Sequence, residues 1–275
     1  MLLARLTLTA VTVSGVCVAT SCVKSSSQVV YRPDTARREL VLRRHLFKEP
    51  VFVERAREGD LVAIRLFLAA GMSPNVKNEG GDTPLIAAST NGHAKVVTTL
   101  LAVGAVVNER DREGQTAVMR AVREGSTETV RALLKKRADV DVQSPTGSTA
   151  LMYAVWRNNL DIFQMLLDAG ADVNHSDTNV GTALMWAVYY NRLPMARILL
   201  EKGADPNKIN SRGGTPLMVA AANGYRDLVQ ILLENGADAS LKDKENRTAL
   251  RWATENNRAE VARVLGDLGT KASNQ

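Results

Sequence analysis

Apolar residues return in the same phase along most of the chain. The hexapeptides TPLIAA, TAVMRA, TALMYA, TALMWA, TPLMVA and TALRWA begin at Thr83, Thr116, Thr149, Thr182, Thr215 and Thr248, so successive copies lie 33 residues apart. A pair of leucines follows five of these copies, at 100–101, 133–134, 166–167, 199–200 and 232–233. The pattern predicts two short helices in each unit. Because one such unit cannot bury its own apolar face, the units are expected to stack into a solenoid.

Residues that begin and end helices fall at matching points of each unit. A Thr precedes each first helix, where its hydroxyl can cap a free N–H group, and Pro84 and Pro216 fit the first turn. The turn between the two helices carries Gly or Asn, which tolerate a left-handed backbone: Gly92, Gly125, Asn158, Asn191, Gly224 and Asn257. Arg137 replaces the Gly that ends the second helix in other units. It predicts a strained turn costing about 1 kcal/mol.

The repeat resembles the ankyrin repeat. Gly-Ala-Asp triplets close three units, at 170–172, 203–205 and 236–238, and the same register placed on 57–71 indicates a degenerate amino-terminal unit. The resemblance implies an all-α ankyrin-repeat solenoid, built from stacked helix-turn-helix units with β-hairpin connections, whose function is protein binding. Seven units are expected in one domain over residues 50–275: 50–82, 83–115, 116–148, 149–181, 182–214, 215–247 and 248–275.

One column of the repeat departs from the family. Met119, Met152, Met185 and Met218 stand where ankyrin repeats usually have His. A column of flexible apolar side chains predicts core packing rather than a ligand site. It also resembles the repeats common in bacterial ankyrin proteins.

The first 21 residues are predicted to be a signal peptide. Arg5 precedes an uncharged, largely apolar run over residues 6–20, as in secretory signals. Ala19-Thr20-Ser21 before Cys22 resembles the lipobox of bacterial lipoproteins, which implies lipidation of Cys22, and the following Val23 resembles lipoproteins sorted to the outer membrane. An ordinary cleaved signal and an uncleaved membrane span are the alternatives.

Residues 22–49 are predicted to form a tether followed by a basic helix. The segment holds seven of the chain's 35 Lys and Arg residues against three Asp or Glu residues. A helix within residues 33–47 places Ala36, Leu40 and Phe47 near one face, where they would cover the apolar end of the first repeat. Its arginines are also suited to anionic lipid headgroups beside the anchor. The two interpretations are compatible.

Charge and cysteine content exclude several classes of protein. Residues 50–275 carry 27 of the 35 basic and 26 of the 29 acidic side chains, so the body is balanced and no nucleic-acid partner is expected. The two cysteines, Cys17 and Cys22, both lie in the first 22 residues, which excludes a disulfide framework in the rest of the chain. The three histidines, His45, His93 and His175, fall at distant points of a stack, so we expect no metal, no cofactor and no enzymatic activity.

Aromatic residues gather on two adjacent units. Six of the twelve in the chain lie between Tyr153 and Tyr190. The positions seven and eight residues after each Thr are those with which ankyrin proteins line their concave face, and here they hold Arg123, Trp156, Arg157, Tyr189 and Tyr190. Since Trp, Tyr and Arg dominate interface energetics, this row predicts a partner-binding surface. Tyr153 and Trp186 are expected either to flank it or to pack between first helices, with hairpin-tip residues Arg112 and Arg212 at its rim.

The sequence therefore predicts a protein-binding module of the bacterial cell envelope, periplasmic and lipid-anchored to the outer membrane through Cys22, or else secreted. By analogy with bacterial ankyrin-repeat lipoproteins, it is expected to be an immunity protein that neutralises a secreted antibacterial toxin such as a lipase. A periplasmic scaffold or stress-related accessory protein for an envelope enzyme, or an effector exported to a host, are the alternatives.

Overall fold

The chain is all-helical wherever its structure is described. The computed structural model describes residues 32–43 and 46–272, so the predicted signal peptide, Cys22 and His45 lie outside the described residues. Fifteen helices and no strands occur in the described part. Two isolated antiparallel bridges, Arg110 with Thr116 and Ser176 with Thr182, are the β pairings found there. The all-α prediction is confirmed, and the expected β-hairpins are corrected to turns.

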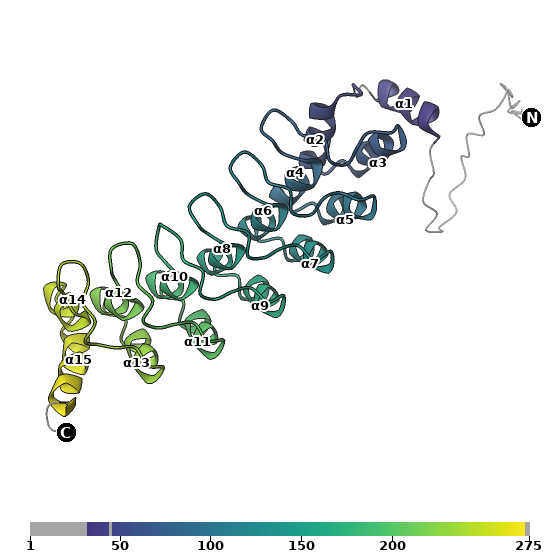
Figure 1. Ribbon diagram of the computed structural model, residues 1–275. Coiled ribbons are helices and arrows are strands. Elements are labelled where there is room, and N and C mark those ends of the chain that lie inside the picture. The colour runs from purple at the N-terminus through teal and green to yellow at the C-terminus, as the bar shows by residue number, and fades with distance from the viewer. Residues whose placement is uncertain (1–31, 44–45, 273–275) are drawn as a thin grey trace, which may run out of the picture. The chain divides into compact units, whose positions relative to one another are not determined.

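The helices form two rows (Figure 1). The first helices of successive units are α2 (Glu49–Glu58), α4 (Pro84–Thr90), α6 (Ala117–Glu124), α8 (Ala150–Arg157), α10 (Ala183–Tyr189), α12 (Pro216–Asn223) and α14 (Ala249–Glu255). The second helices are α3 (Leu61–Ala69), α5 (Ala94–Ala102), α7 (Thr127–Lys135), α9 (Leu160–Asp168), α11 (Leu193–Glu201), α13 (Arg226–Glu234) and α15 (Ala259–Ala272). Each first helix packs against the next first helix and against the second helix of its own unit. None of the helices in the described residues is long and apolar enough to cross a membrane.

Small and flexible side chains fill the space between first helices. The alanine column is fully buried at Ala88, Ala121, Ala154, Ala187, Ala220 and Ala253, which lets neighbouring helices approach closely. The methionine column at Met119, Met152, Met185 and Met218 is also buried, as predicted. These residues belong to one continuous apolar core along the stack, as expected for repeats that bury surface only against their neighbours.

Each turn before a first helix is closed by a side chain five residues ahead of the capping Thr. The residue there accepts a hydrogen bond from the backbone N–H four positions later at Asn78, Asp111, Ser144, Asp177, Asn210 and Asp243. A short polar side chain can take the place of a backbone acceptor in such turns. Because it satisfies the turn internally, no paired strands are needed.

The caps and the left-handed turns follow the sequence closely. The Thr hydroxyl accepts a bond from the N–H three residues on in five first helices, whereas the hydroxyl of Thr149 is buried without a partner. Arg137 has a φ of 56° at the end of α7, which confirms the predicted strained turn.

Helix α1 (Pro33–Leu42) covers the first unit by packing against α3. Ala36 and Leu40 are buried there, as expected, and the Arg37 guanidinium donates to the Ala70 carbonyl oxygen at 3.3 Å. The helix ends at Leu42, so Phe47 lies outside it. Phe47 nevertheless stacks on Phe67 with ring centroids 5.9 Å apart, which places it on the first unit by a different route from the one expected.

Candidate functional site

The ends of α8 and α10 carry exposed aromatic side chains. The earlier residues of both helices lie between neighbouring units, so Leu151, Val155 and Leu184 are buried. Trp156 and Tyr189 lie beyond that packing and are 40% and 52% exposed. Large rings left this open in an otherwise well-packed stack are suited to contact another molecule.

Tyr190 joins the exposed rings to the buried ones. Its ring lies 5.1 Å from that of Tyr189 at an interplanar angle of 84°, and 5.7 Å from that of Trp186. The side chain of Tyr190 is half-buried as a result. Edge-to-face contacts of this kind hold both tyrosine rings in fixed positions.

Two arginines are held against aromatic rings in the same area. The Arg157 guanidinium lies 5.7 Å from the Trp156 ring centroid and donates to the Glu124 carbonyl oxygen at 3.0 Å. The Arg123 guanidinium lies 5.6 Å from the Tyr153 ring centroid. These contacts fix the cations while leaving donors free for a ligand. We call the set Arg123, Tyr153, Trp156, Arg157, Tyr189 and Tyr190 the aromatic surface.

Trp186 lies beneath this surface. It is only 8% exposed, and its indole N–H donates to the Asp177 carboxylate at 3.1 Å. The same carboxylate oxygen accepts a bond from the Ser148 hydroxyl at 2.8 Å. Trp186 therefore supports the turns beside the aromatic surface, and its own accessible area is small.

The same position in other units also ties a first helix to its turn. In the last unit, the Trp252 indole donates to Asp243 at 2.8 Å, and Arg247 lies 3.9 Å above the Trp252 ring. Burial alone would raise the pKa of the Asp243 carboxyl, but its hydrogen bonds from Arg247 and Trp252 and the Arg247 charge outweigh burial and lower it. The interaction consequently favours the charged carboxylate.

Arg120 has the equivalent role in the unit that precedes Tyr153. It donates to both Asp111 and Glu113. Burial alone would lower the pKa of the Arg120 guanidinium, but its hydrogen bond to Asp111 and the two acidic charges raise it. The sequence analysis did not single out Arg120, although the register that selected Tyr153 and Trp186 contains it.

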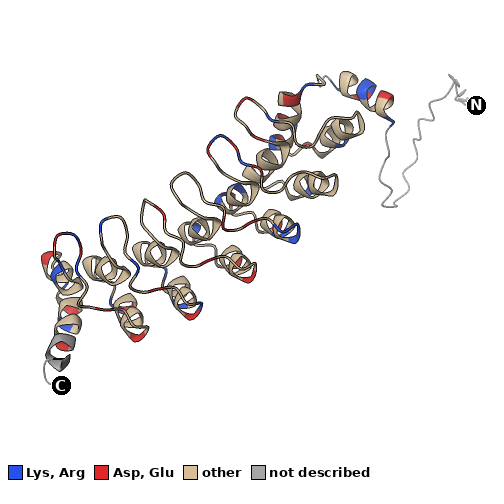
Figure 2. Cartoon of the chain, in the orientation of Figure 1, with Lys and Arg blue, Asp and Glu red and all other residues tan. Residues whose placement is uncertain are grey.

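The turn tips beside the aromatic surface are nearly uncharged. Residues 143–148 contain no charged side chain, and the one acidic residue of 176–181, Asp177, is buried. Charged tips stand on either side of these two turns, with Arg112 and Arg212 both exposed (Figure 2). Thr178 links the two neutral turns through bonds from its N–H and hydroxyl to the Thr146 carbonyl oxygen, a role that the sequence analysis missed.

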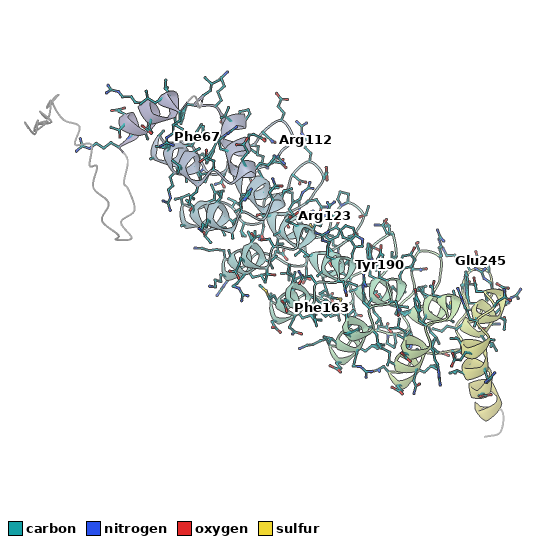
Figure 3. The ribbon with its side chains drawn as sticks, turned by 180° about the vertical axis from the view of Figure 1, so that it is seen from behind. Phe67, Arg112, Arg123, Phe163, Tyr190 and Glu245 are labelled. Atoms are coloured by element: carbon teal, nitrogen blue, oxygen red, sulfur yellow. The ribbon has the colours of Figure 1, made fainter. Side chains whose placement is uncertain are left out.

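The predicted binding residues thus fall into three groups. Arg123, Tyr153, Trp156, Arg157, Tyr189 and Tyr190 lie together, Trp186 lies beneath them, and Arg112 and Arg212 lie on separate turn tips. Figure 3 shows Arg112, Arg123 and Tyr190 on the side of the first helices and their turns, with Phe163 in the row of second helices. No group of three or more metal-ligating side chains occurs within the described part of the chain.

Comparison with known families identifies the repeat. Four overlapping segments, 53–144, 104–177, 137–210 and 184–275, match the family model described as ankyrin repeats (3 copies). The chain is an ankyrin-repeat protein. An ankyrin-repeat domain is a protein–protein interaction module, and members of the family are typically non-enzymatic. No curated protein matches the chain.

Solved structures share the fold over most of the ankyrin-repeat chain. The ankyrin repeat domain of Bcl-3, described as a unique member of the IkappaB protein family, is 32% identical with a TM-score of 0.68, over 77% of this chain and 97% of that one. The human ASB11 ankyrin repeat domain is 26% identical with a TM-score of 0.67, over 78% of this chain and 96% of that one. Both likenesses support the solenoid architecture.

Proposed function

We propose that this protein binds one dedicated partner protein through the aromatic surface, without catalysing a reaction. The observation that carries the proposal is the exposure of Trp156 and Tyr189 beside arginines held by ring contacts. Aromatic and arginine side chains that are fixed before binding lose little conformational entropy on association. A preformed surface of this kind is typical of a specific interface.

The chemistry of the surface favours a particular kind of partner. Arg123 and Arg157 are its cations, Glu124 is the acidic side chain next to them, and the adjoining tips in 143–148 and 176–181 offer hydroxyl groups instead of charge. An apolar protrusion bordered by carboxylates would place its side chains between the rings and its charges on the arginines.

We further propose that the protein acts in the bacterial cell envelope, anchored to the outer membrane by lipidation of Cys22. The support is the uncharged run over 6–20 and the Ala-Thr-Ser-Cys sequence that ends at Cys22. In that place the partner would be a secreted antibacterial toxin such as a lipase, and the protein its immunity factor. A scaffold for an envelope enzyme and an effector exported to a host are the competing functions.

Affinity capture from the native envelope tests the binding surface. The wild-type protein is compared with the triple variant Trp156→Ala, Tyr189→Ala and Tyr190→Ala. A control variant, Leu160→Ala, Ile209→Ala and Leu250→Ala, removes exposed apolar side chains elsewhere on the stack. We expect one stoichiometric partner with wild type and control, and a loss of several kcal/mol in affinity with the first variant. Circular dichroism checks that both variants remain folded.

The outcomes separate the functions. Equal capture by the folded aromatic variant and the control contradicts the aromatic surface as the binding site. A toxin as partner, together with killing of cells in which the gene is deleted, supports immunity, whereas an envelope enzyme whose activity is unchanged by binding supports a scaffold. Mass spectrometry of the amino-terminal peptide tests the anchor, since an acylated Cys22 argues against an exported effector.

A further inference from the structure

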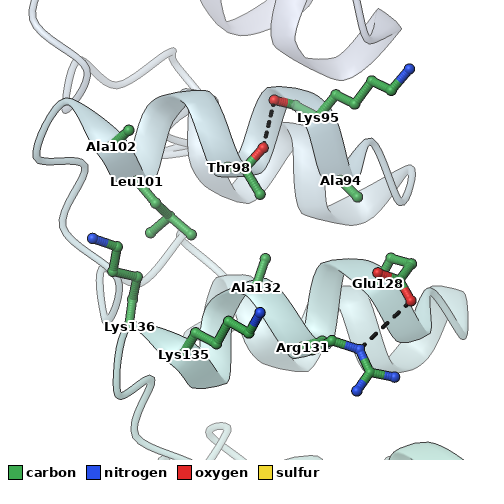
Figure 4. A pocket seen from close by; sticks show the side chains of 10 residues that line it. All are labelled: Ala94, Lys95, Thr98, Leu101, Ala102, Glu128, Arg131, Ala132, Lys135 and Lys136. Atoms are coloured by element: carbon green, nitrogen blue, oxygen red, sulfur yellow. Dashed lines mark hydrogen bonds and ion pairs between the residues drawn. The ribbon is translucent and has the colours of Figure 1, made fainter.

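A shallow groove lies between α5 and α7, in the row of second helices (Figure 4). Its volume is about 470 Å³. Small and apolar side chains form its floor, among them Ala94, Leu101, Ala102 and Ala132. Its rim is formed by Lys95 of α5 and by Arg131, Lys135 and Lys136 at the end of α7. The groove therefore combines an apolar floor with a cationic border.

The groove exists because side chains that fill this place in later units are missing here. Ala132 occupies the register position held by Met165, Ile198 and Ile231 in the following three second helices. Each of those larger side chains is half-buried or buried against the core. A residue of that size at position 132 would close the groove with a side chain the fold already accommodates.

The charge at the groove is reversed relative to the later units. Lys135 stands where the next three second helices have Asp168, Glu201 and Glu234. Arg131 lies 3.6 Å from Glu128, whereas Lys95, Lys135 and Lys136 form no ion pair with any described residue. Figure 2 shows the blue side chains at the end of α7 and red ones at the ends of α9 and α13. Three unpaired cations around one groove attract an anionic ligand.

Exposed apolar residues border these cations in the repeat register. Val62, 45% exposed, stands one unit before Lys95, and Val103, 49% exposed, stands one unit before Lys136. Helix α1, which packs on α3, adds the exposed Val41 and Leu42. Cations next to exposed aliphatic side chains are typical of surfaces that lie on a lipid headgroup layer.

We propose that the surface formed by α3, α5 and α7 docks on a bilayer of anionic phospholipid, with one headgroup phosphate seated in the groove. Lys95, Lys135 and Lys136 supply the charge, and Val62 and Val103 contact the acyl boundary. Helix α1 continues this surface toward the amino-terminal apolar run over 6–20, which lies close in the chain. The docking surface belongs to the second helices and the aromatic surface to the first, so a docked molecule keeps its partner surface free.

Vesicle co-sedimentation of the full chain tests the proposal. The vesicles are phosphatidylcholine with or without phosphatidylglycerol. The groove variant is Lys135→Glu with Lys136→Glu, and its control is Lys202→Glu with Lys208→Glu, which changes the net charge equally on later units where both lysines are exposed. A third variant, Ala132→Ile, fills the groove without changing charge. All four proteins share the amino-terminal segment, so differences among them report on the groove.

We expect wild type and control to prefer phosphatidylglycerol vesicles. The groove variant should lose about tenfold or more in partition coefficient, since each cation near the headgroups contributes to binding, and Ala132→Ile should lose several-fold. Equal loss in the groove variant and its control would overturn the proposal, because net charge alone would explain it. Absence of a preference in the wild type would overturn it too, and would assign the groove to an acidic protein segment.

Discussion

The indole N–H of Trp186 donates to the Asp177 carboxylate at 3.1 Å, on the oxygen that also accepts the Ser148 hydroxyl. The other oxygen of Asp177 accepts three backbone N–H groups of its own turn. One buried carboxylate therefore joins helix α10 to two successive turns. The aromatic surface lies directly above this junction, because Tyr190 packs on the Trp186 ring.

Replacing Trp186 by Phe removes the indole donor while keeping an aromatic ring. We expect Trp186→Phe to lower the free energy of unfolding by about 1–3 kcal/mol, because a buried charged acceptor loses a hydrogen bond. Partner affinity should change little, since the side chain is almost inaccessible. Urea unfolding measures the first effect and binding titration the second.

Trp156→Phe is the matched control, because that indole is exposed and makes no hydrogen bond to another described residue. Its stability should stay close to that of the wild type, while its affinity falls. The opposite result, with Trp186→Phe weakening binding and leaving stability unchanged, would place Trp186 in the interface.

The sequence predicts most of the fold because its register is rigid. Every 33 residues the same Thr begins a helix and the same Ala is buried, so one unit describes the others. Single interactions depart from that register where two units meet. Thr149 has the capping residue but not the capping bond, and Phe47 reaches Phe67 from outside its helix.

The site is less predictable than the fold because side-chain exposure depends on the neighbouring unit. Tyr189 and Tyr190 are adjacent in sequence, yet the first is exposed and the second half-buried against Trp186. The groove at Ala132 likewise arises from a contrast between units. A comparison of each residue with its counterparts 33 positions away would have revealed the groove, whereas a search for helix patterns within one unit does not.

The acid sensitivity of the last unit should depend on Asp243. The pKa of this carboxyl is lowered in the folded state, so its stabilising contribution is complete above the unfolded value of about 3.9 and disappears as pH falls through the folded value. We expect Asp243→Asn to destabilise this unit by about 1–2 kcal/mol at neutral pH and by progressively less in acid. Urea unfolding followed by Trp252 fluorescence, at several pH values, measures the difference.

Asn is a suitable replacement because Asn78 and Asn210 hold the same position in other units and make the same backbone bond. A stability difference that stays constant from neutral to acid pH would show that geometry, rather than the carboxylate charge, accounts for the loss. Asp177→Asn offers an internal comparison, since that residue also accepts an indole but has no arginine stacked on it.

Arg137 adopts a backbone conformation that costs free energy for any residue with a side chain. Its φ is 56°, and the residues at the same position in other units, Gly104, Gly170, Gly203 and Gly236, have φ between 85° and 90°. We expect Arg137→Gly to raise the free energy of unfolding by about 0.5–1 kcal/mol, because relief of the left-handed strain exceeds the entropy that Gly adds to the unfolded chain. Thermal and urea unfolding measure this gain.

Arg137→Ala decides whether the gain comes from the backbone. Alanine keeps the Cβ atom that makes the left-handed conformation unfavourable, so its stability should remain close to that of the wild type. Arg137 also stands beside Lys135 and Lys136, and losing its charge would relieve repulsion between like charges in both variants equally. If Ala and Gly stabilise the protein to the same extent, repulsion explains the effect, and only a gain confined to Gly assigns it to the strained turn.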